Sequence, residues 1–235
     1  MRLTPKDILG HISGGRVLDL AAGSGGFVHF LIDGLKDYTE IIGVDNDERA
    51  ASAFTDAFKD HPNVHFELQD AAQLDFEDSS FDMVCISNSL HHLDPRPALR
   101  QMKRILRPGG SLLVSEMIRD KQTETQLTHV HLHHWWAAVD RINGVVHHET
   151  YRRAEILTLV YGLGLCNEVI YEIHDLEADP KDPAIIAELN PVFEQYIQRA
   201  ARHPHLQARG EKLRKRVEQV GFHSATTLVI IGQKP

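Results

Sequence analysis

Short apolar runs alternate with amphipathic stretches of helical spacing from residue 16 to about residue 117. The runs are rich in Val, Ile, Leu or Phe and are bounded by turn residues, a pattern that predicts β-strands. Five strands are expected: RVLDLA (16–21), EIIGVD (40–45), VHFELQ (64–69), FDMVCIS (81–87) and SLLVSE (111–116). Because strands that alternate with helices build parallel sheets with right-handed crossovers, this half of the chain predicts an α/β fold.

The pattern changes after Glu116. The last helix before this point is expected at 95–106, with Asp94 as its N-cap. After this point, a long amphipathic helix crowded with His and Trp is expected at 120–143. The other elements expected are a helix at 152–164, a strand at 167–174, helices at 183–201 and 206–220, and a strand at 225–232. The whole chain therefore predicts a seven-stranded, mostly parallel sheet with helices on both faces and helical insertions after strands five and six.

A glycine-rich turn in VLDLAAGSGGF (17–27) follows the first expected strand and opens directly into a helix. Gly23 and Gly25 lack a Cβ, so the backbone there can approach a ligand closely. Asp45 closes the next strand twenty residues after Gly25, where nucleoside-binding folds place the acid that binds ribose hydroxyls. The two glycines could instead only allow close helix–strand packing, and Asp45 or Asp70 could cap a helix, but their combined spacing favours a nucleoside site.

The charges near the turn select the kind of nucleoside. The dinucleotide fingerprint G-x-G-x-x-G, begun at Gly23, needs a glycine where this chain has Val28, and the P-loop sequence is absent. Asp19, just before the turn, would repel a pyrophosphate but could pair with a cationic amino-acid group. S-adenosylmethionine carries an α-ammonium and a sulfonium and has no phosphate. The residues therefore favour S-adenosylmethionine over NAD.

These residues resemble the class I methyltransferase family, in particular its ubiquinone- and menaquinone-biosynthesis-type branch. The family's first motif reads roughly [D/E]-x-G-x-G-x-G, and this chain has alanine, Ala21, in place of the first glycine. The other matching runs are LQDAAQLDF (68–76), SSFDMVCISNSLHHL (79–93) and LRPGGSLLVSE (106–116). The resemblance covers about residues 15–117, and it implies a Rossmann-like fold and S-adenosyl-L-methionine as cofactor.

The resemblance also implies a role for individual residues. Asp19 would lie near the amino-acid end of the cofactor, Asp45 would hold its ribose, and Asp70 would reach its adenine amino group. The positions expected to bind the cofactor are Asp19, Ala21, Gly23, Gly25, Asp45, Asn46, Asp70, Ala71 and Asn88.

The helix QLTHVHLHHWWAAVDR (126–141) carries candidate chemistry outside the resemblance. His129 and His133 lie four residues apart, on one face of a helix. That spacing suits a metal pair, and histidine is the side chain best able to act as a base near neutral pH. No carboxylate motif completes a metal site, so no metal ligand is assigned, and a metal pair stays open as the least favoured alternative. The helix could supply a catalytic base, wall a substrate pocket with Trp135 and Trp136 beside a flat or apolar substrate, or only pack.

Composition and charge narrow the partners and the location. The chain has 235 residues, of which 42% are hydrophobic and 25% charged, as in an ordinary soluble protein. Its first fifteen residues have an apolar stretch too short for a signal peptide, so a cytoplasmic location without membrane contact is expected. The net charge of −8 argues against a nucleic-acid surface. Cys85 and Cys166 both lie in strand-like runs and are expected to be buried, inert thiols.

We therefore expect one methyltransferase domain over 1–235, with a cofactor-binding core at 15–117, a helical cap insertion at 118–150 and a helical insertion at 175–224. The expected reaction is in-line displacement at the sulfonium methyl by a small organic molecule, with His129 and His133 as candidate catalytic bases. A homo-oligomer is left open. The alternative is a non-catalytic module that binds S-adenosylmethionine for regulation or for a protein partner.

Overall fold

The computed structural model describes residues 3–235; Met1 and Arg2, which belong to the segment where no signal peptide is expected, lie outside that range. The chain forms two compact units. The first unit comprises Met1–Glu116, Ala154–Glu172 and Leu228–Pro235, and the second comprises Met117–Arg153 and Ile173–Thr227. The second unit is therefore made of two insertions into the first. Across residues 3–235, no helix is long and apolar enough to cross a bilayer.

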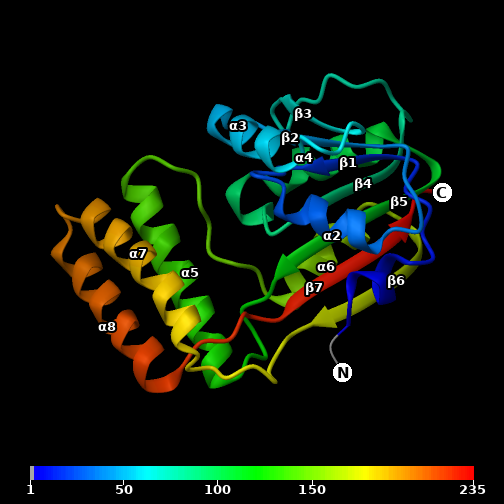
Figure 1. Ribbon diagram of the computed structural model, residues 1–235. Helices are drawn as coiled ribbons and strands as arrows, with labels where there is room; N and C mark the ends of the chain where they lie inside the picture. Colours follow the sequence, from blue (N-terminus) through cyan, green and yellow to red (C-terminus); the bar gives the residue numbers. More distant parts are fainter. Residues whose placement is uncertain (1–2) are drawn as a thin grey trace. The chain divides into compact units, whose positions relative to one another are not determined.

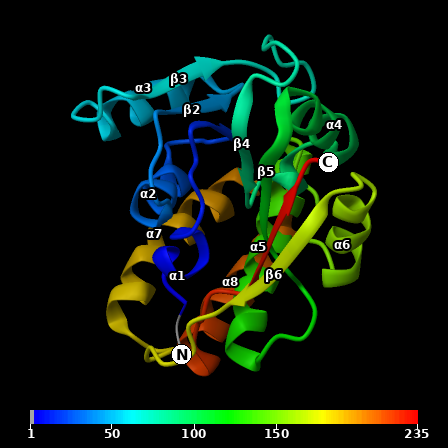
Figure 2. The same ribbon diagram turned by 90° about the vertical axis from the view of Figure 1, so that its right-hand side faces the viewer.

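The first unit contains a seven-stranded sheet of strand order β3-β2-β1-β4-β5-β7-β6 (Figure 1). The strands are β1 (Arg16–Leu20), β2 (Glu40–Asp45), β3 (Val64–Leu68), β4 (Phe81–Ser87), β5 (Leu106–Met117), β6 (Cys166–Ile173) and β7 (Thr227–Gln233). Strands β1 to β5 pair in parallel, whereas Figure 1 shows β7 running against β5. Figure 2 shows β4, β5, β7 and β6 following one another across the sheet. The predicted seven-stranded, mostly parallel Rossmann-like sheet is confirmed.

Helices flank this sheet because its central strands are apolar on both faces. In β1, the side chains of Val17, Leu18 and Leu20 are completely buried, which is typical of a parallel strand covered on both sides. The helices of this unit are α1 (Pro5–Leu9), α2 (Gly26–Gly34), α3 (Glu48–Ala57), the 3-10 helix η1 (Leu90–His92), α4 (Pro95–Ile105) and α6 (Arg153–Tyr161).

The caps explain where two of these helices begin. The Asp94 side chain accepts a hydrogen bond from the Arg96 backbone N–H at 3.1 Å, which confirms the predicted N-cap of α4. Helix α1 has no counterpart in the sequence prediction. It begins at a reciprocal capping box, in which Thr4 accepts from the Asp7 backbone N–H and Asp7 accepts from the Thr4 backbone N–H.

Strand β5 is longer than the predicted run 111–116 because its start pairs with the end of the chain. The Gly109 N–H donates to the Lys234 carbonyl at 2.7 Å, and the Lys234 N–H donates to the Gly110 carbonyl at 3.0 Å. The Pro-Gly-Gly segment that ends α4 thus already runs along the last strand, a long-range pairing that local patterning does not reveal.

The second unit is built around three helices, α5 (Glu124–Ile142), α7 (Pro183–Arg199) and α8 (Pro204–Val220), which pack on one another (Figure 1). The Trp135 indole lies at the centre of their apolar core, with no exposed surface, and donates its N–H to the Leu206 carbonyl at 2.8 Å. Gly210 allows this packing, because a Cβ there would overlap the Trp135 ring. Of the roles left open for this helix, packing is therefore the role of Trp135: it is a core residue with a satisfied polar atom.

Candidate functional site

The predicted cofactor positions gather at one edge of the sheet. They follow the carboxyl ends of β1, β2, β3 and β4, which are neighbours in the strand order. The strands end in register, since Leu20 pairs with both Val44 and Ile86. The loop after β4 is tied to the glycine-rich turn by the Ser89 hydroxyl, which donates to the Ala21 carbonyl at 3.2 Å. In open α/β sheets, ligands bind outside this edge.

The glycine-rich turn needs a left-handed backbone at three positions. Ala21, Gly23 and Gly25 have φ values of 55°, 53° and 90°. Ala21 occupies the position of the motif's first glycine, and its positive φ explains why the motif prefers glycine there. An alanine with this backbone conformation adds strain of ~1–3 kcal/mol. At Gly25 a Cβ would overlap the buried Phe58 ring, whereas at Gly23 it would meet no atom within 4 Å. Gly25 is thus required by packing, while Gly23 leaves open space beside the turn.

Asp45 is fixed by the backbone around it. Its Oδ2 accepts from the Gly23 N–H at 2.9 Å and its Oδ1 accepts from the Asp47 N–H at 3.0 Å. These bonds hold the carboxylate against the glycine-rich turn. A carboxylate accepts about four hydrogen bonds, so sites remain for the hydroxyl groups of a ligand.

Asp19 is the most unusual group at this edge. Its side chain is only 1% exposed, and neither carboxyl oxygen has a hydrogen-bond partner among residues 3–235. Burial, and secondarily the charge of Asp45, raises the pKa of Asp19 to about 8. A buried acid without a partner costs stability, and a positive ligand group would relieve that cost. The residue therefore fits the ammonium end of S-adenosylmethionine.

The remaining predicted cofactor residues lie at the same edge and are more exposed than Asp19. Asn46, Asp70 and Asn88 are exposed and Ala71 is half-buried. The Asp70 Oδ1 accepts from the Ala72 N–H at 2.8 Å, a local turn contact of the kind that aspartate makes without any ligand. Asn88 has a positive φ of 47°.

A buried pair behind this edge joins His91 to Glu116, an acid that the sequence analysis did not single out. His91 and Glu116 are both fully buried, and His91 Nδ1 lies 2.7 Å from Glu116 Oε1. The other oxygen of Glu116 accepts from the Leu90 N–H at 2.9 Å. A glutamate at the end of the apolar run SLLVSE was the available signal, because a charge there needs a partner. The pair fixes the loop after β4 to the end of β5.

The two predicted catalytic histidines lie in the second unit, on α5, and have different surroundings. The His129 Nδ1 accepts from the Ala225 backbone N–H at 2.9 Å. Burial lowers the pKa of His129 to about 4, so its ring is neutral at neutral pH. The His133 Nδ1 lies 3.3 Å from the Nε2 of His147 instead.

His147 in turn contacts a buried acid, Asp140, that the sequence analysis did not single out. The His147 Nδ1 lies 2.6 Å from the Oδ2 of Asp140, which is 5% exposed. Asp140 also pairs with Arg199 at 2.6 Å and accepts from the Tyr196 hydroxyl at 3.2 Å. Burial raises the pKa of Asp140, but the hydrogen bond from His147 and the charge of Arg199 outweigh it and hold that pKa below its usual value.

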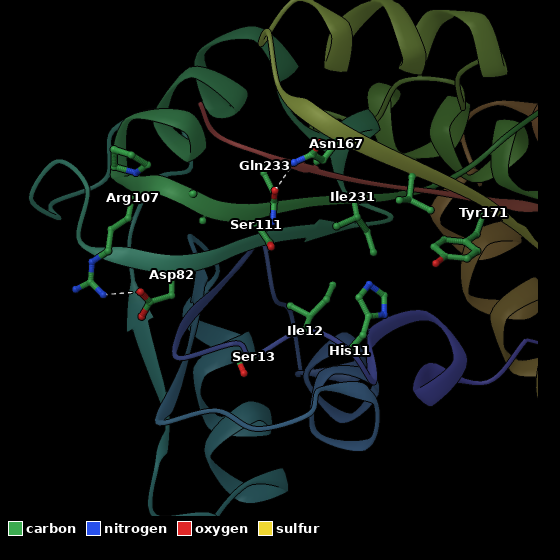
Figure 3. Close-up of a pocket in the computed structure, with 15 residues that line it drawn as sticks. His11, Ile12, Ser13, Asp82, Arg107, Ser111, Asn167, Tyr171, Ile231 and Gln233 are labelled. Atoms are coloured by element: carbon green, nitrogen blue, oxygen red, sulfur yellow. Dashed lines mark hydrogen bonds and ion pairs between the residues drawn. The ribbon is translucent and has the colours of Figure 1, made fainter.

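A cavity of about 680 Å³ in the first unit lies away from the cofactor positions (Figure 3). It is lined by the starts of β4, β5 and β6 and by the end of β7. Two pairs of its polar side chains contact each other: Arg107 pairs with Asp82 at 2.5 Å, and Asn167 donates to Gln233 at 2.7 Å. No predicted cofactor residue lines this cavity, so its size does not make it the cofactor site.

The two cysteines differ from each other. Cys85 is buried in β4, and burial, together with the charge of Asp19, raises the pKa of its thiol. Cys166 is exposed, which corrects the prediction that both are buried. It begins β6, the outermost strand of the sheet, where one side has no neighbouring strand.

Comparison with known proteins agrees with this geometry. Residues 17–110 match the family model described as a methyltransferase domain. The chain is 39% identical over 111 residues to a demethylmenaquinone methyltransferase from Beutenbergia cavernae, covering 47% of this chain and 44% of the relative. It is 36% identical over 114 residues to a ubiquinone/menaquinone biosynthesis C-methyltransferase from Vibrio campbellii, with the same two shares. The chain thus spans less than half the length of these relatives.

The fold comparison covers more of the chain. The crystal structure of the YcgJ protein from Bacillus subtilis superposes with a TM-score of 0.60, covering 94% of this chain and 92% of that one at 18% identity. At this identity, the likeness concerns the fold alone. The motif, the buried acid at the sheet edge and the family model over residues 17–110 agree that this part of the chain is similar to class I, S-adenosylmethionine-dependent methyltransferases, among them relatives named for quinone biosynthesis.

Proposed function

We propose that this protein transfers the methyl group of S-adenosylmethionine to a small organic molecule. The observation that carries the proposal is the buried Asp19 carboxyl, which has no partner among residues 3–235 and lies at the sheet edge beside an open glycine-rich turn. A dinucleotide would bring a second negative charge to this acid, whereas S-adenosylmethionine brings an ammonium group.

The chain's own residues supply cofactor binding. Asp19 pairs with the ammonium group, the open space at Gly23 admits the ligand, and Asp45, held by two backbone N–H groups, accepts from the ribose hydroxyls. Asp70, Ala71, Asn46 and Asn88 complete the adenosine side. When bound, the cofactor supplies an electrophilic methyl carbon whose bond to sulfur breaks with the electron pair remaining on sulfur.

The acceptor is proposed to be a small aromatic or quinol-like molecule with an ionisable O–H or C–H. The names of the relatives support this class, since they describe enzymes that methylate quinone precursors. Of the two histidines predicted as bases, His133 suits the role better. The His129 Nδ1 already accepts a hydrogen bond from the Ala225 N–H, and the pKa of His129 is about 4, so His129 is a weak base.

The test combines binding with turnover. Purified protein is titrated with S-adenosylmethionine by calorimetry, then incubated with the methyl-labelled cofactor and a panel of hydroquinones that includes a short-chain demethylmenaquinol. We expect binding and at least one labelled, extractable product, and neither with Asp19→Ala. Binding without product from any acceptor would contradict the proposal and favour a regulatory module. Absence of binding would overturn the cofactor assignment for this chain.

A further inference from the structure

The cavity of about 680 Å³ in the first unit has the size of a small-molecule site, and the proposed function does not use it. All of its lining residues belong to the first unit. Strands β4 and β5 begin beside the cavity, whereas the predicted cofactor positions follow the carboxyl ends of the strands. A molecule bound in the cavity would therefore not occupy the place of S-adenosylmethionine.

Hydrogen bonds hold two walls of this cavity in place. In the loop after α1, the Ile12 carbonyl accepts from the Lys36 N–H at 3.0 Å, and the Ser13 hydroxyl donates to the Asp37 Oδ2 at 3.1 Å. The opposite wall is the start of β5, which pairs with the end of the chain as described above. Because these walls are formed without a ligand, little ordering of the protein opposes binding.

The lining offers a ligand no unpaired carboxylate, guanidinium or ammonium group. Among the lining residues, Asp82 is the only acid and Arg107 is the only arginine or lysine, and the two pair with each other at 2.5 Å. The Asp82 Oδ2 also accepts from the Arg16 N–H at 2.9 Å, which holds the pair at one end of the cavity (Figure 3). A charged ligand would lose hydration here without meeting an opposite charge, so a neutral ligand suits the cavity better.

Apolar side chains line another part of the cavity. Figure 3 shows Ile12 and Ile231 projecting into it, away from the ion pair. Val169 of β6 lines the same space and is 44% exposed. A flat apolar ring that covers these side chains removes their surface from water, which favours binding.

Three polar side chains of the lining, those of His11, Ser111 and Tyr171, make no hydrogen bond with residues 3–235. Figure 3 shows His11 and Tyr171 at the same end of the cavity as Ile12 and Ile231. The Tyr171 hydroxyl can donate a hydrogen bond, and so can one nitrogen of the His11 ring. A ligand oxygen can accept such a bond without displacing a contact within the protein.

We propose that this cavity is a second small-molecule site, which binds a neutral, flat aromatic molecule carrying a hydroxyl or carbonyl oxygen. The ring lies against Ile12, Val169 and Ile231, and the oxygen accepts from the Tyr171 hydroxyl. The site does not depend on the proposed methyl transfer, because none of its lining residues is a predicted cofactor position.

The place of binding can be read from isoleucine methyl groups. Protein labelled with ¹³C in the isoleucine δ1 methyls is titrated with 2-naphthol, a neutral two-ring phenol, and signals are assigned with Ile12→Val and Ile231→Val. We expect both signals to shift saturably with a Kd below about 1 mM. The signal of Ile156, which is buried in the first unit outside the lining, should stay in place. Charged 2-naphthoate should bind at least about 10-fold more weakly.

Two pairs of variants test the contacts. Val169→Glu places a charge on the cavity wall and should weaken 2-naphthol binding at least about 10-fold, whereas Val146→Glu, at an exposed valine of the second unit, should leave it unchanged. Tyr171→Phe should weaken binding by about 2- to 10-fold through the loss of one hydrogen bond. Tyr161→Phe, at an exposed tyrosine of α6, is its control.

The proposal is overturned if the two methyl signals do not shift, if 2-naphthoate binds as tightly as 2-naphthol, or if Tyr171→Phe binds like the wild type. Circular dichroism checks that Val169→Glu folds, and the methyl shifts and the tyrosine pair decide the question if it does not. Saturating S-adenosylmethionine should leave the 2-naphthol Kd unchanged. Absence of S-adenosylmethionine binding would refute the proposed function but not this site, so the two failures are distinguishable.

Discussion

Within residues 3–235 each unit buries one aspartate, and the pKa values of the two carboxyls shift in opposite directions. Asp19 in β1 has no partner, and its pKa rises to about 8. Asp140 in α5 is nearly as deeply buried but contacts Arg199, His147 and Tyr196, and its pKa falls below the usual value. Removal from water penalises both anions, so the partners decide the outcome. A buried acid that has no protein partner is suited to bind a ligand, whereas an acid with three partners stabilises the side chains around it.

The largest effect is expected from removing the paired acid. Asp140→Ala leaves Arg199 and the His147 N–H without their common acceptor, which should reduce the free energy of unfolding by about 3–5 kcal/mol. Urea unfolding followed by circular dichroism measures this, with Glu188→Ala on the exposed surface of α7 as the matched control. Equal midpoints for the two variants would show that the Asp140 contacts contribute nothing to the fold.

Removing the unpaired acid should act on the ligand rather than on the fold. Asp19→Asn loses the charge that faces the ammonium group, at a cost of about 3 kcal/mol or roughly 100-fold in the Kd of S-adenosylmethionine. Its stability without ligand should stay the same or increase, because folding at neutral pH then no longer requires this carboxyl to take up a proton. Calorimetry and urea unfolding test the two halves, with Asp60→Asn as an exposed control. If Asp19→Asn were destabilised but bound S-adenosylmethionine as tightly as the wild type, Asp19 would support the fold and not the ligand.

Substitutions of the two turn glycines should distinguish an effect on the stability of the first unit from an effect on cofactor binding. Gly25→Ala forces a Cβ onto the Phe58 ring at a φ of 90° and should cost about 2 kcal/mol or more of stability. Gly23→Ala meets open space, so it should cost only ~1 kcal/mol from its positive φ but should reduce affinity for the cofactor. Thermal unfolding and calorimetry of both variants decide this. If Gly23→Ala bound the cofactor as tightly as the wild type, the open space would not be the ligand's place.

The last comparison concerns the slope of stability with pH. Because the folded-state pKa of Asp19, about 8, exceeds its unfolded value of about 3.9, its contribution is fully present below that unfolded value and is lost as the pH rises toward 8. Asp140 contributes in the opposite sense: its stabilisation is present above its unfolded pKa and is lost as the pH falls through its folded value.

Urea unfolding at pH 5, 6 and 7 isolates the Asp19 contribution. The wild type should lose stability relative to Asp19→Asn by at most about 1.4 kcal/mol per pH unit. Parallel curves for the two proteins would show that the Asp19 carboxyl is not the buried acid described here. Binding of S-adenosylmethionine at pH 7 should also release a proton, because Asp19 must ionise to pair with the ammonium. Calorimetry in buffers of different ionisation enthalpy measures that release.

Much of the first unit was predictable because its signals are local. Apolar runs bounded by turns marked every strand of the sheet, Asp94 marked the start of α4, and the spacing from Asp19 through Asp70 marked the edge that is proposed to bind the cofactor. A parallel strand buried on both faces must be apolar throughout, and a close backbone approach must use glycine. These requirements act on neighbouring residues, so a single sequence displays them. The helices of the second unit were also visible, from their capping residues and prolines.

Only the tertiary structure decided which side chains meet across long separations. Nothing local distinguishes Trp135, which is buried in the core, from Trp136, whose N–H has no partner among residues 3–235. The sequence likewise does not show that His129 bonds to Ala225 or that Asp140 joins Arg199 and His147. Such contacts depend on how helices and loops pack, and the same residue types occur equally in solvated positions. The sequence determined the sheet and the edge proposed to bind the cofactor; packing alone determined the partners of the buried acids and of the histidines.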